Sequence, residues 1–204
     1  MKIGIYGGTF DPPHIAHMIL ADEARDRLGL AKVLWVLTPQ SPFKEHVELA
    51  PLEDRLAMLE AALAGDPRFQ LSRAEIDRPA PQYTVDTVRA LREEHPGHRL
   101  YYLMGGDSLH DLPTWHNPIG IIANCDGIGV MRRPGDRINL DELESNLPGL
   151  AGKLVFIDAP LIQISGTEIR SRIAAGEAFR YFLRPEVFRI IVERRLYGFD
   201  GTSE

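Results

Sequence analysis

Residues 3–17 read IGIYGGTFDPPHIAH, and this stretch decides the fold of the chain. Its first four residues are typical of a buried strand, and two glycines follow them directly. Glycine lets backbone N–H groups approach a ligand closely. A helical pattern then begins at about residue 14, and the N-terminal end of a helix attracts anions. The stretch therefore predicts a strand, a glycine turn and a helix, with an anion site where they meet.

The rest of the chain alternates short apolar runs with longer helical patterns. We predict strands over 3–6, 32–37, 100–104, 128–131 and 154–157, and helices over 14–28, 51–64, 84–94, 166–175 and 185–195. Apolar strands that alternate with helices indicate an α/β fold, a doubly wound parallel sheet with helices on both faces. Such sheets bind ligands outside the carboxyl ends of their strands, where the strand order switches.

Composition excludes several classes of protein. The 204 residues carry 23 Lys and Arg against 29 Asp and Glu, and a formal charge of −6 argues against a general nucleic-acid coat. No apolar run approaches the roughly 18 residues of a membrane helix. The single cysteine, Cys125, forms no internal disulfide, and no Cys/His cluster has zinc-ligand spacing. We expect one cytoplasmic domain over residues 1–204; the oligomeric state, a homo-oligomer included, stays open.

His14 and His17 are the first candidate ligands for a phosphate. They lie three residues apart on the first helical turn, so they share a face near the helix N-terminus. Imidazoles donate hydrogen bonds to phosphate oxygens, more strongly when protonated. In the alternative reading Asp11 caps the helix and the histidines are ordinary surface or core residues. The P-loop and GxGxxG fingerprints are both absent.

A second candidate lies near the other end of the chain, where residues 164–170 read ISGTEIR. Ser165 and Glu168 have the spacing of a capping box, which would simply begin a helix. The same helix start, with its free amides, Thr167 and Arg170, also suits a polyphosphate.

Three segments together carry a family resemblance. Residues 7–17, GGTFDPPHIAH, resemble the GGTFDPxHxGH signature of nucleotidyltransferases with the HxGH motif, and residues 164–170 resemble their ISSTxIR signature. Residues 105–116, GGDSLHDLPTWH, resemble the GxDxxxxLxxW block of bacterial nicotinate-nucleotide adenylyltransferases. Length and motif spacing match over nearly the whole chain, which is identified as a member of that family.

The resemblance implies a Rossmann-like nucleotidyltransferase fold and one reaction. An adenylyl group passes from ATP to nicotinate mononucleotide, giving deamido-NAD and pyrophosphate in a step of NAD biosynthesis. It also implies Mg²⁺ that arrives with ATP, because no carboxylate cluster suggests a metal site of the protein itself. The C-terminal helical part, about 164–204, is expected to complete the ATP site.

The resemblance also assigns roles to residues. It implies catalytic roles for His14, His17, Lys44 and Arg170, and ATP binding by Gly7, Gly8, Thr9, Phe10, His14, His17, Ser165, Thr167 and Arg170. It implies that nicotinate mononucleotide is bound by Tyr83, Thr84, Asp107, Trp115 and Arg132. Arg133 is the alternative to Arg132 as the residue that contacts the phosphate of the mononucleotide. We expect Thr84 to cap its helix, whose N-terminus then favours a carboxylate on the pyridine. Trp115 stacks on the pyridine ring in this reading, and anchors the core in the alternative one.

Two departures from the family signatures stand out. Ala16 replaces the usual glycine between the histidines, and we expect it to narrow the space near adenine or ribose. Gly166 replaces the second serine of ISST and so removes one hydroxyl donor. Such a bond to a charged group is worth on the order of 1.5–3 kcal/mol where it forms.

Three other functions compete with this reading. The same chemistry could serve another phosphate acceptor, such as nicotinamide mononucleotide or phosphopantetheine. A non-catalytic nucleotide-binding regulator could keep the fold, with Gly166 as the feature in its favour. A class I aminoacyl-tRNA synthetase is disfavoured by the short chain and by the absence of a KMSKS-like loop.

Overall fold

The computed structural model describes residues 1–40, 48–132, 138–158, 160 and 162–201. Their strands are β1 (Lys2–Gly8), β2 (Lys32–Leu37), β3 (Phe69–Ser72), β4 (Arg99–Gly105), β5 (Gly127–Arg132) and β6 (Leu154–Asp158). Their α-helices are α1 (Ile15–Leu28), α2 (Leu52–Leu63), α3 (Thr84–Glu94), α4 (Gly106–Asp111), α5 (Pro118–Asn124), α6 (Leu140–Asn146), α7 (Gly166–Ala174) and α8 (Pro185–Glu193). Short 3₁₀ turns cover Leu112–Thr114, Ala151–Lys153, Arg180–Phe182 and Leu196–Gly198.

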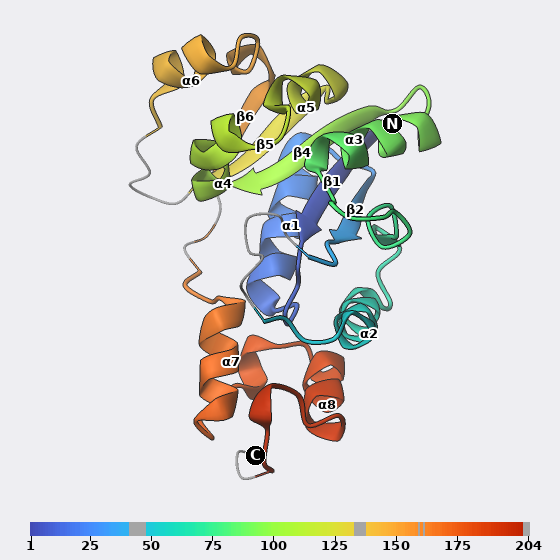
Figure 1. Cartoon of the computed structure of the whole chain (residues 1–204), viewed down its shortest axis with the longest axis vertical. Helices are drawn as coiled ribbons and strands as arrows, with labels where there is room; N and C mark the ends of the chain where they lie inside the picture. Colours follow the sequence, from blue (N-terminus) through green and yellow to red (C-terminus); the bar gives the residue numbers. More distant parts are fainter. Residues whose placement is uncertain (41–47, 133–137, 159, 161, 202–204) are drawn as a thin grey trace.

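The strands form one parallel sheet in the order β3-β2-β1-β4-β5-β6. The chain builds outward from β1 to β2 and β3, then returns to the other side of β1 for β4 to β6. Figure 1 shows β2 on one side of β1 and β4, β5 and β6 on the other. The order therefore switches between β1 and β4, and the prediction of a doubly wound sheet is confirmed. Ligands of such sheets bind beyond the carboxyl ends of the strands at this point.

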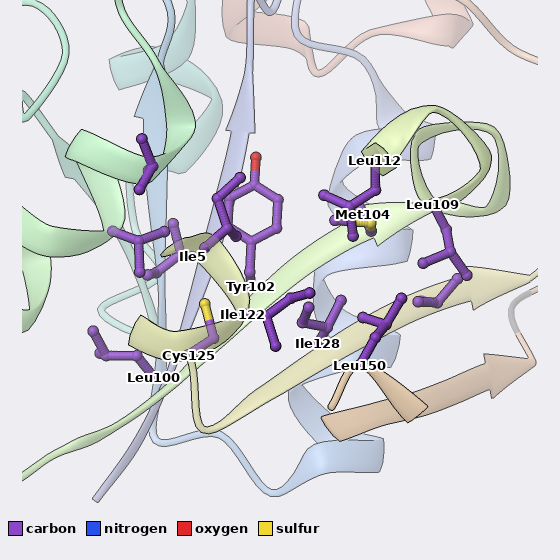
Figure 2. Packing of buried hydrophobic residues seen from close by; sticks show 14 of the residues in the cluster. Ile5, Leu100, Tyr102, Met104, Leu109, Leu112, Ile122, Cys125, Ile128 and Leu150 are labelled. Carbon is purple, nitrogen blue, oxygen red and sulfur yellow. The ribbon is translucent and has the colours of Figure 1, made fainter. Parts of the chain in front are cut away.

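Side chains alternate between two apolar layers along the strands, as the two-residue period of a strand requires. In β2, Leu34 and Val36 belong to the cluster under α3, α4, α5 and α6, whereas Val33, Trp35 and Leu37 belong to the cluster under α1 and α2. Figure 2 shows part of the first cluster, in which Ile5, Tyr102 and Ile128 of the sheet meet Ile122 and Cys125. Because both faces are covered, the strands read as continuous apolar runs.

A third apolar cluster joins the C-terminal segments to the body of the protein. Met58 and Ala62 of α2 pack with Ile169 and Ile173 of α7 and with residues of α8. Figure 1 shows α7 and α8 at the end of the molecule toward which β1 points, with α8 next to α2. This packing brings the start of α7 to the carboxyl edge of the sheet.

The sequence prediction missed β3 and the helices α4, α5 and α6. β3 is a four-residue edge strand, and the three helices have six or seven residues each. None of these elements is long enough for its apolar residues to show a clear strand or helix periodicity. The first strand also extends through Gly7 and Gly8, which were expected in the turn.

Candidate functional site

One cavity of about 790 Å³ lies over the carboxyl ends of β1, β4 and β5. Its walls include every site residue expected from the sequence that the structure describes: Gly7, Gly8, Thr9, Phe10, His14, His17, Tyr83, Thr84, Asp107, Trp115, Arg132, Ser165, Thr167 and Arg170. Lys44 and Arg133 lie outside the described residues. Segments more than 150 residues apart thus meet at the switch point of the sheet.

The loop after β1 is held tightly against its surroundings. The N–H of Thr38 donates to the carbonyl of Gly8 at 2.9 Å, and Phe10 adopts a left-handed backbone (φ 43°). The Phe10 side chain is only 2% exposed and packs edge-on against Tyr6 and His17. The Phe10 side chain therefore packs under the loop, and the ATP binding expected of this residue from the sequence could use mainly its backbone.

The two histidines stack on each other at the start of α1, with ring centroids 3.6 Å apart. His14 is the N-cap residue and is buried, whereas His17 is partly exposed. The backbone N–H of His14 donates to Nδ1 of His17 at 3.2 Å. This bond leaves the proton of the neutral His17 ring on Nε2, which can then donate to a ligand. The reading in which Asp11 caps this helix is wrong.

Both imidazoles are neutral near pH 7 in the unliganded protein. Burial lowers the pKa of His14 to about 4. Burial, and then the neighbouring His14, hold the pKa of His17 well below its usual value. The pair consequently offers neutral hydrogen-bond donors rather than cations.

The start of α7 closes the cavity from the C-terminal side. Ser165 caps the helix by accepting from the N–H of Glu168 at 3.1 Å. The Glu168 carboxylate pairs instead with Arg172 at 2.8 Å, so only half of the expected capping box forms. Arg170 donates from Nη1 to the carbonyl of Asp11 at 2.7 Å. That bond ties α7 to the loop after β1.

Gly166 has a steric role that the sequence did not reveal. A Cβ atom at this position would lie 2.6 Å from the carbonyl oxygen of Asp11. The glycine thus permits the close approach of α7 to the loop, besides lacking the hydroxyl of the family's serine.

The start of α3 forms the opposite wall. Its N-cap is Tyr83 rather than the expected Thr84, and the Tyr83 side chain makes no capping hydrogen bond among the described residues. The first amides of a helix have no partner within the helix, so this end can bind an anion. Tyr83 stacks on His116 with ring centroids 4.0 Å apart.

Trp115 packs against the core and also lines the cavity. It packs against the apolar cluster shown in part in Figure 2, and its ring lies edge-on to that of Tyr102, with ring centroids 6.2 Å apart. A ring held in this way can present an apolar surface to a flat ligand.

Two charged residues lie near the rim of the cavity. Asp107 is exposed in the first turn of α4. Arg132 ends β5 and pairs with Asp158 of β6 at 2.8 Å. Since that ion pair is solvent-exposed, Arg132 can exchange it for a ligand anion at little cost.

Sequence reasoning missed Arg55, which joins the loops that follow β1 and β2. This arginine is 2% exposed and donates to the carbonyls of Thr9, Thr38, Pro39 and Ala50 at 2.6–3.1 Å. It lies three, four and seven residues from Met58, Leu59 and Ala62 on the buried face of α2. The signal in the sequence was an arginine at the helical spacing of the apolar residues, which indicates that its side chain is buried.

Glu75 was also missed, although it lines the cavity between the loop after β2 and α3. It is 5% exposed and accepts a hydrogen bond from the Thr87 hydroxyl at 2.6 Å. Its pKa is raised, chiefly by burial, against the opposing effects of Thr87, Thr38 and Arg78.

We predict a pH-dependent stability difference for Glu75→Gln. Because its pKa is raised in the folded protein, ionising the Glu75 carboxyl costs more in the folded state than in the unfolded state. Its contribution to the free energy of unfolding therefore declines as pH rises above roughly 4.3, the usual pKa of Glu. The Tm of the variant minus that of the wild type should therefore be larger at pH 8 than at pH 4, measured by thermal unfolding. Each kcal/mol corresponds to roughly 2–4 °C in a chain of this size. A difference that does not change with pH would contradict the prediction.

Other features bear on cofactors and reactivity. Within the described ranges there is no group of three or more His, Cys, Asp or Glu that could hold a metal ion. The same residues include no helix long and apolar enough to cross a membrane. Cys125 is buried, and burial raises the pKa of its thiol to about 12, which makes it an inert core residue.

Comparison with known proteins gives consistent results. Residues 5–172 match the model of the Cytidylyltransferase-like family. The chain is 41% identical to the "Probable nicotinate-nucleotide adenylyltransferase" of Thermomicrobium roseum, over 96% of this chain and 91% of the relative. It is 38% identical to the protein of the same name from Geobacillus kaustophilus, over 97% and 86%.

Solved structures agree on the fold. The nicotinic acid mononucleotide adenylyltransferase of Plasmodium falciparum superposes with a TM-score of 0.77 in its complex with APC and 0.78 in its complex with NaAD. Each alignment covers 98% of both chains, at 19% and 20% identity respectively.

Proposed function

This chain belongs to the nicotinate-nucleotide adenylyltransferase family, and we propose that it transfers the adenylyl group of ATP to nicotinate mononucleotide, giving deamido-NAD and pyrophosphate. One observation carries the proposal. One cavity at the switch point of the sheet is lined by the histidine pair, by the start of α7 with its arginine, and by the start of α3. The N-cap side chain of α3 makes no capping hydrogen bond among the described residues. Such a cavity suits two anionic substrates that must be brought together.

The ATP end lies between the loop after β1 and the start of α7. We assign to it the backbone of Gly7, Gly8, Thr9 and Phe10, the side chains of His14, His17, Thr167 and Arg170, and the N-terminal turn that Ser165 caps. Helix amides and a guanidinium are suitable donors to phosphate oxygens. The His14 ring is neutral before binding, and the approach of the triphosphate favours its protonation and strengthens its bond to the nucleotide. His17 donates from Nε2 as a neutral ring, because its Nδ1 accepts from the backbone of His14.

The acceptor end lies at the start of α3. The amides there, at Tyr83 and Thr84, favour the carboxylate of the pyridine over an uncharged carboxamide. Trp115 offers its face to the pyridine ring, Asp107 can accept from ribose hydroxyls, and Arg132 can meet the phosphate.

The reaction needs no covalent intermediate with the protein. A phosphate oxygen of nicotinate mononucleotide attacks the α-phosphorus of ATP, a new P–O bond forms, and the bond to the bridging oxygen breaks as pyrophosphate leaves. The protein's contribution is to orient two anions against their repulsion and to stabilise the charge that grows on the pyrophosphate. His14, His17 and Arg170 are the described groups for this role, and we assign Lys44 to it as well.

We propose that Mg²⁺ arrives with the nucleotide rather than being held by the protein. The described residues offer no cluster for a protein-held metal. When bound with the nucleotide, Mg²⁺ would neutralise phosphate charge. We further propose that residues 1–204 act as one domain, that the part from about 164 completes the ATP site, and that the protein works in the cytoplasm.

Pyrophosphate release by the purified protein tests the proposal. With ATP and Mg²⁺, we expect release with nicotinate mononucleotide, together with deamido-NAD in equal amount, and none with phosphopantetheine or without an acceptor. Release with phosphopantetheine alone would reassign the acceptor. A folded protein that releases none with either acceptor would contradict the proposed transfer and favour a nucleotide-binding regulator.

A further inference from the structure

Tyr197 reaches from the C-terminal turn to the loop after β1. Its hydroxyl donates to Oδ1 of Asp11 at 2.7 Å, across 186 positions of the sequence. The Asp11 side chain is 1% exposed, so this hydrogen bond is shielded from water. The bond connects a residue near the end of the described chain to the segment that carries the histidine pair.

The backbone around Tyr197 is unusual for its residue types. Tyr197 has φ 59° and Arg195 has φ 51°, both in the left-handed region that bulky side chains rarely adopt. Such conformations cost on the order of 1–3 kcal/mol each and persist where the surroundings hold them. The buried Phe199, packed edge-on against Phe179, anchors the turn on one side, and the Tyr197 hydroxyl anchors it on the other.

Asp11 links Tyr197 to Arg170. Nη1 of Arg170 donates to the Asp11 carbonyl at 2.7 Å and lies 3.6 Å from the carboxylate oxygen Oδ2. Nη2 of the same guanidinium donates to the Thr167 hydroxyl at 3.4 Å. A guanidinium is planar, so fixing one edge against Asp11 fixes the direction of its other donors. The Asp11 carboxylate, in turn, is oriented by Tyr197.

We propose that Tyr197 is a positioning residue for the triphosphate of ATP, acting through Asp11 on Arg170. Tyr197 is not among the described residues that line the cavity, whereas Asp11 and Arg170 are. The inference rests on the proposed function in one respect, that the nucleotide lies against Arg170. Its rival is a purely structural role, in which Tyr197 only fastens the C-terminal turn.

A double-mutant cycle separates these two roles. We expect Tyr197→Phe to weaken binding of α,β-methylene-ATP about tenfold, because a misdirected Arg170 would lose one charge-assisted hydrogen bond to a phosphate. In the Arg170→Ala background, Tyr197→Phe should weaken binding of the analogue less than about twofold, because the group through which Tyr197 acts is absent. Binding is measured by calorimetry, and the KM for nicotinate mononucleotide should stay unchanged in Tyr197→Phe.

The control is Tyr181→Phe, a matched substitution at a side chain that is 88% exposed on the same C-terminal part; it should leave analogue binding unchanged. If Tyr197→Phe does not fold, Asp11→Asn carries the test, since it keeps an acceptor for Tyr197 but removes the charge that faces Arg170. Asp11→Asn should weaken binding of α,β-methylene-ATP about as much as is expected of Tyr197→Phe.

The possible results are distinct. An equal tenfold loss in both backgrounds, or no loss in Tyr197→Phe, would overturn the positioning role. A wild type that binds the analogue but does not turn over nicotinate mononucleotide would contradict the proposed function while leaving the cycle decisive. A wild type that does not bind the analogue would contradict both.

Discussion

Replacing His17 by alanine is expected to lower kcat by about 10²–10³, the loss seen when one transition-state donor is removed. The KM for nicotinate mononucleotide should change little. The reason lies in the geometry of His17, whose Nδ1 accepts from the backbone of His14 and whose Nε2 therefore carries the donor proton. As charge develops on the phosphates, a bond from this fixed donor strengthens, so its loss falls on kcat.

Steady-state pyrophosphate release measures this effect. The matched control is His110→Ala, because His110 is exposed on α4 and is not among the described lining residues. It should retain wild-type kcat. An unchanged kcat in His17→Ala would remove His17 from the mechanism, and a rise in KM alone would assign it to ground-state binding.

Restoring the family's serine at position 166 is expected to damage this protein. In Gly166→Ser the new Cβ would lie 2.6 Å from the carbonyl oxygen of Asp11, so the loop after β1 and the start of α7 must separate. Overpacking of this kind costs about 1–3 kcal/mol. Because Arg170 binds the same carbonyl, its guanidinium moves too. We predict a lower Tm and a higher KM for ATP, measured by thermal unfolding and initial rates.

Gly152→Ser is the control for this substitution. Gly152 is exposed, and a Cβ there would meet nothing within 4 Å among the described residues. It should leave both the Tm and the KM for ATP near their wild-type values. A Gly166→Ser variant with full stability and a lower KM would show instead that the missing hydroxyl is the important feature of this position.

The sequence predicts which segments line the cavity where those segments follow a strand or begin a helix. Residues 7–17, 83–84, 105–116 and 164–170 all come directly after strands or at helix starts, and a parallel sheet brings those ends to one edge. Their meeting in one cavity therefore follows from the alternating pattern. Details within one turn do not: Thr84 is the first residue of α3 rather than its cap, and Glu168 pairs with Arg172.

Contacts that depend on tertiary packing were not predictable from the pattern. Arg55 reads as an ordinary helical arginine until the loops that offer their carbonyls are placed around it. The bond from Tyr197 to Asp11 joins segments whose separation in sequence gives no spacing to recognise. The steric role of Gly166 was not predictable either, because it depends on how α7 packs against the loop after β1.

We propose that one cavity holds ATP at the histidine pair and a pyridine carboxylate at the start of α3. The most direct test compares kcat/KM for nicotinate and nicotinamide mononucleotides in pyrophosphate release. We predict a roughly 5- to 30-fold preference for the nicotinate form, since the end of a helix stabilises an anion by about 1–2 kcal/mol in a partly buried site. Equal values for the two acceptors would contradict the assignment of the α3 N-terminus to the carboxylate.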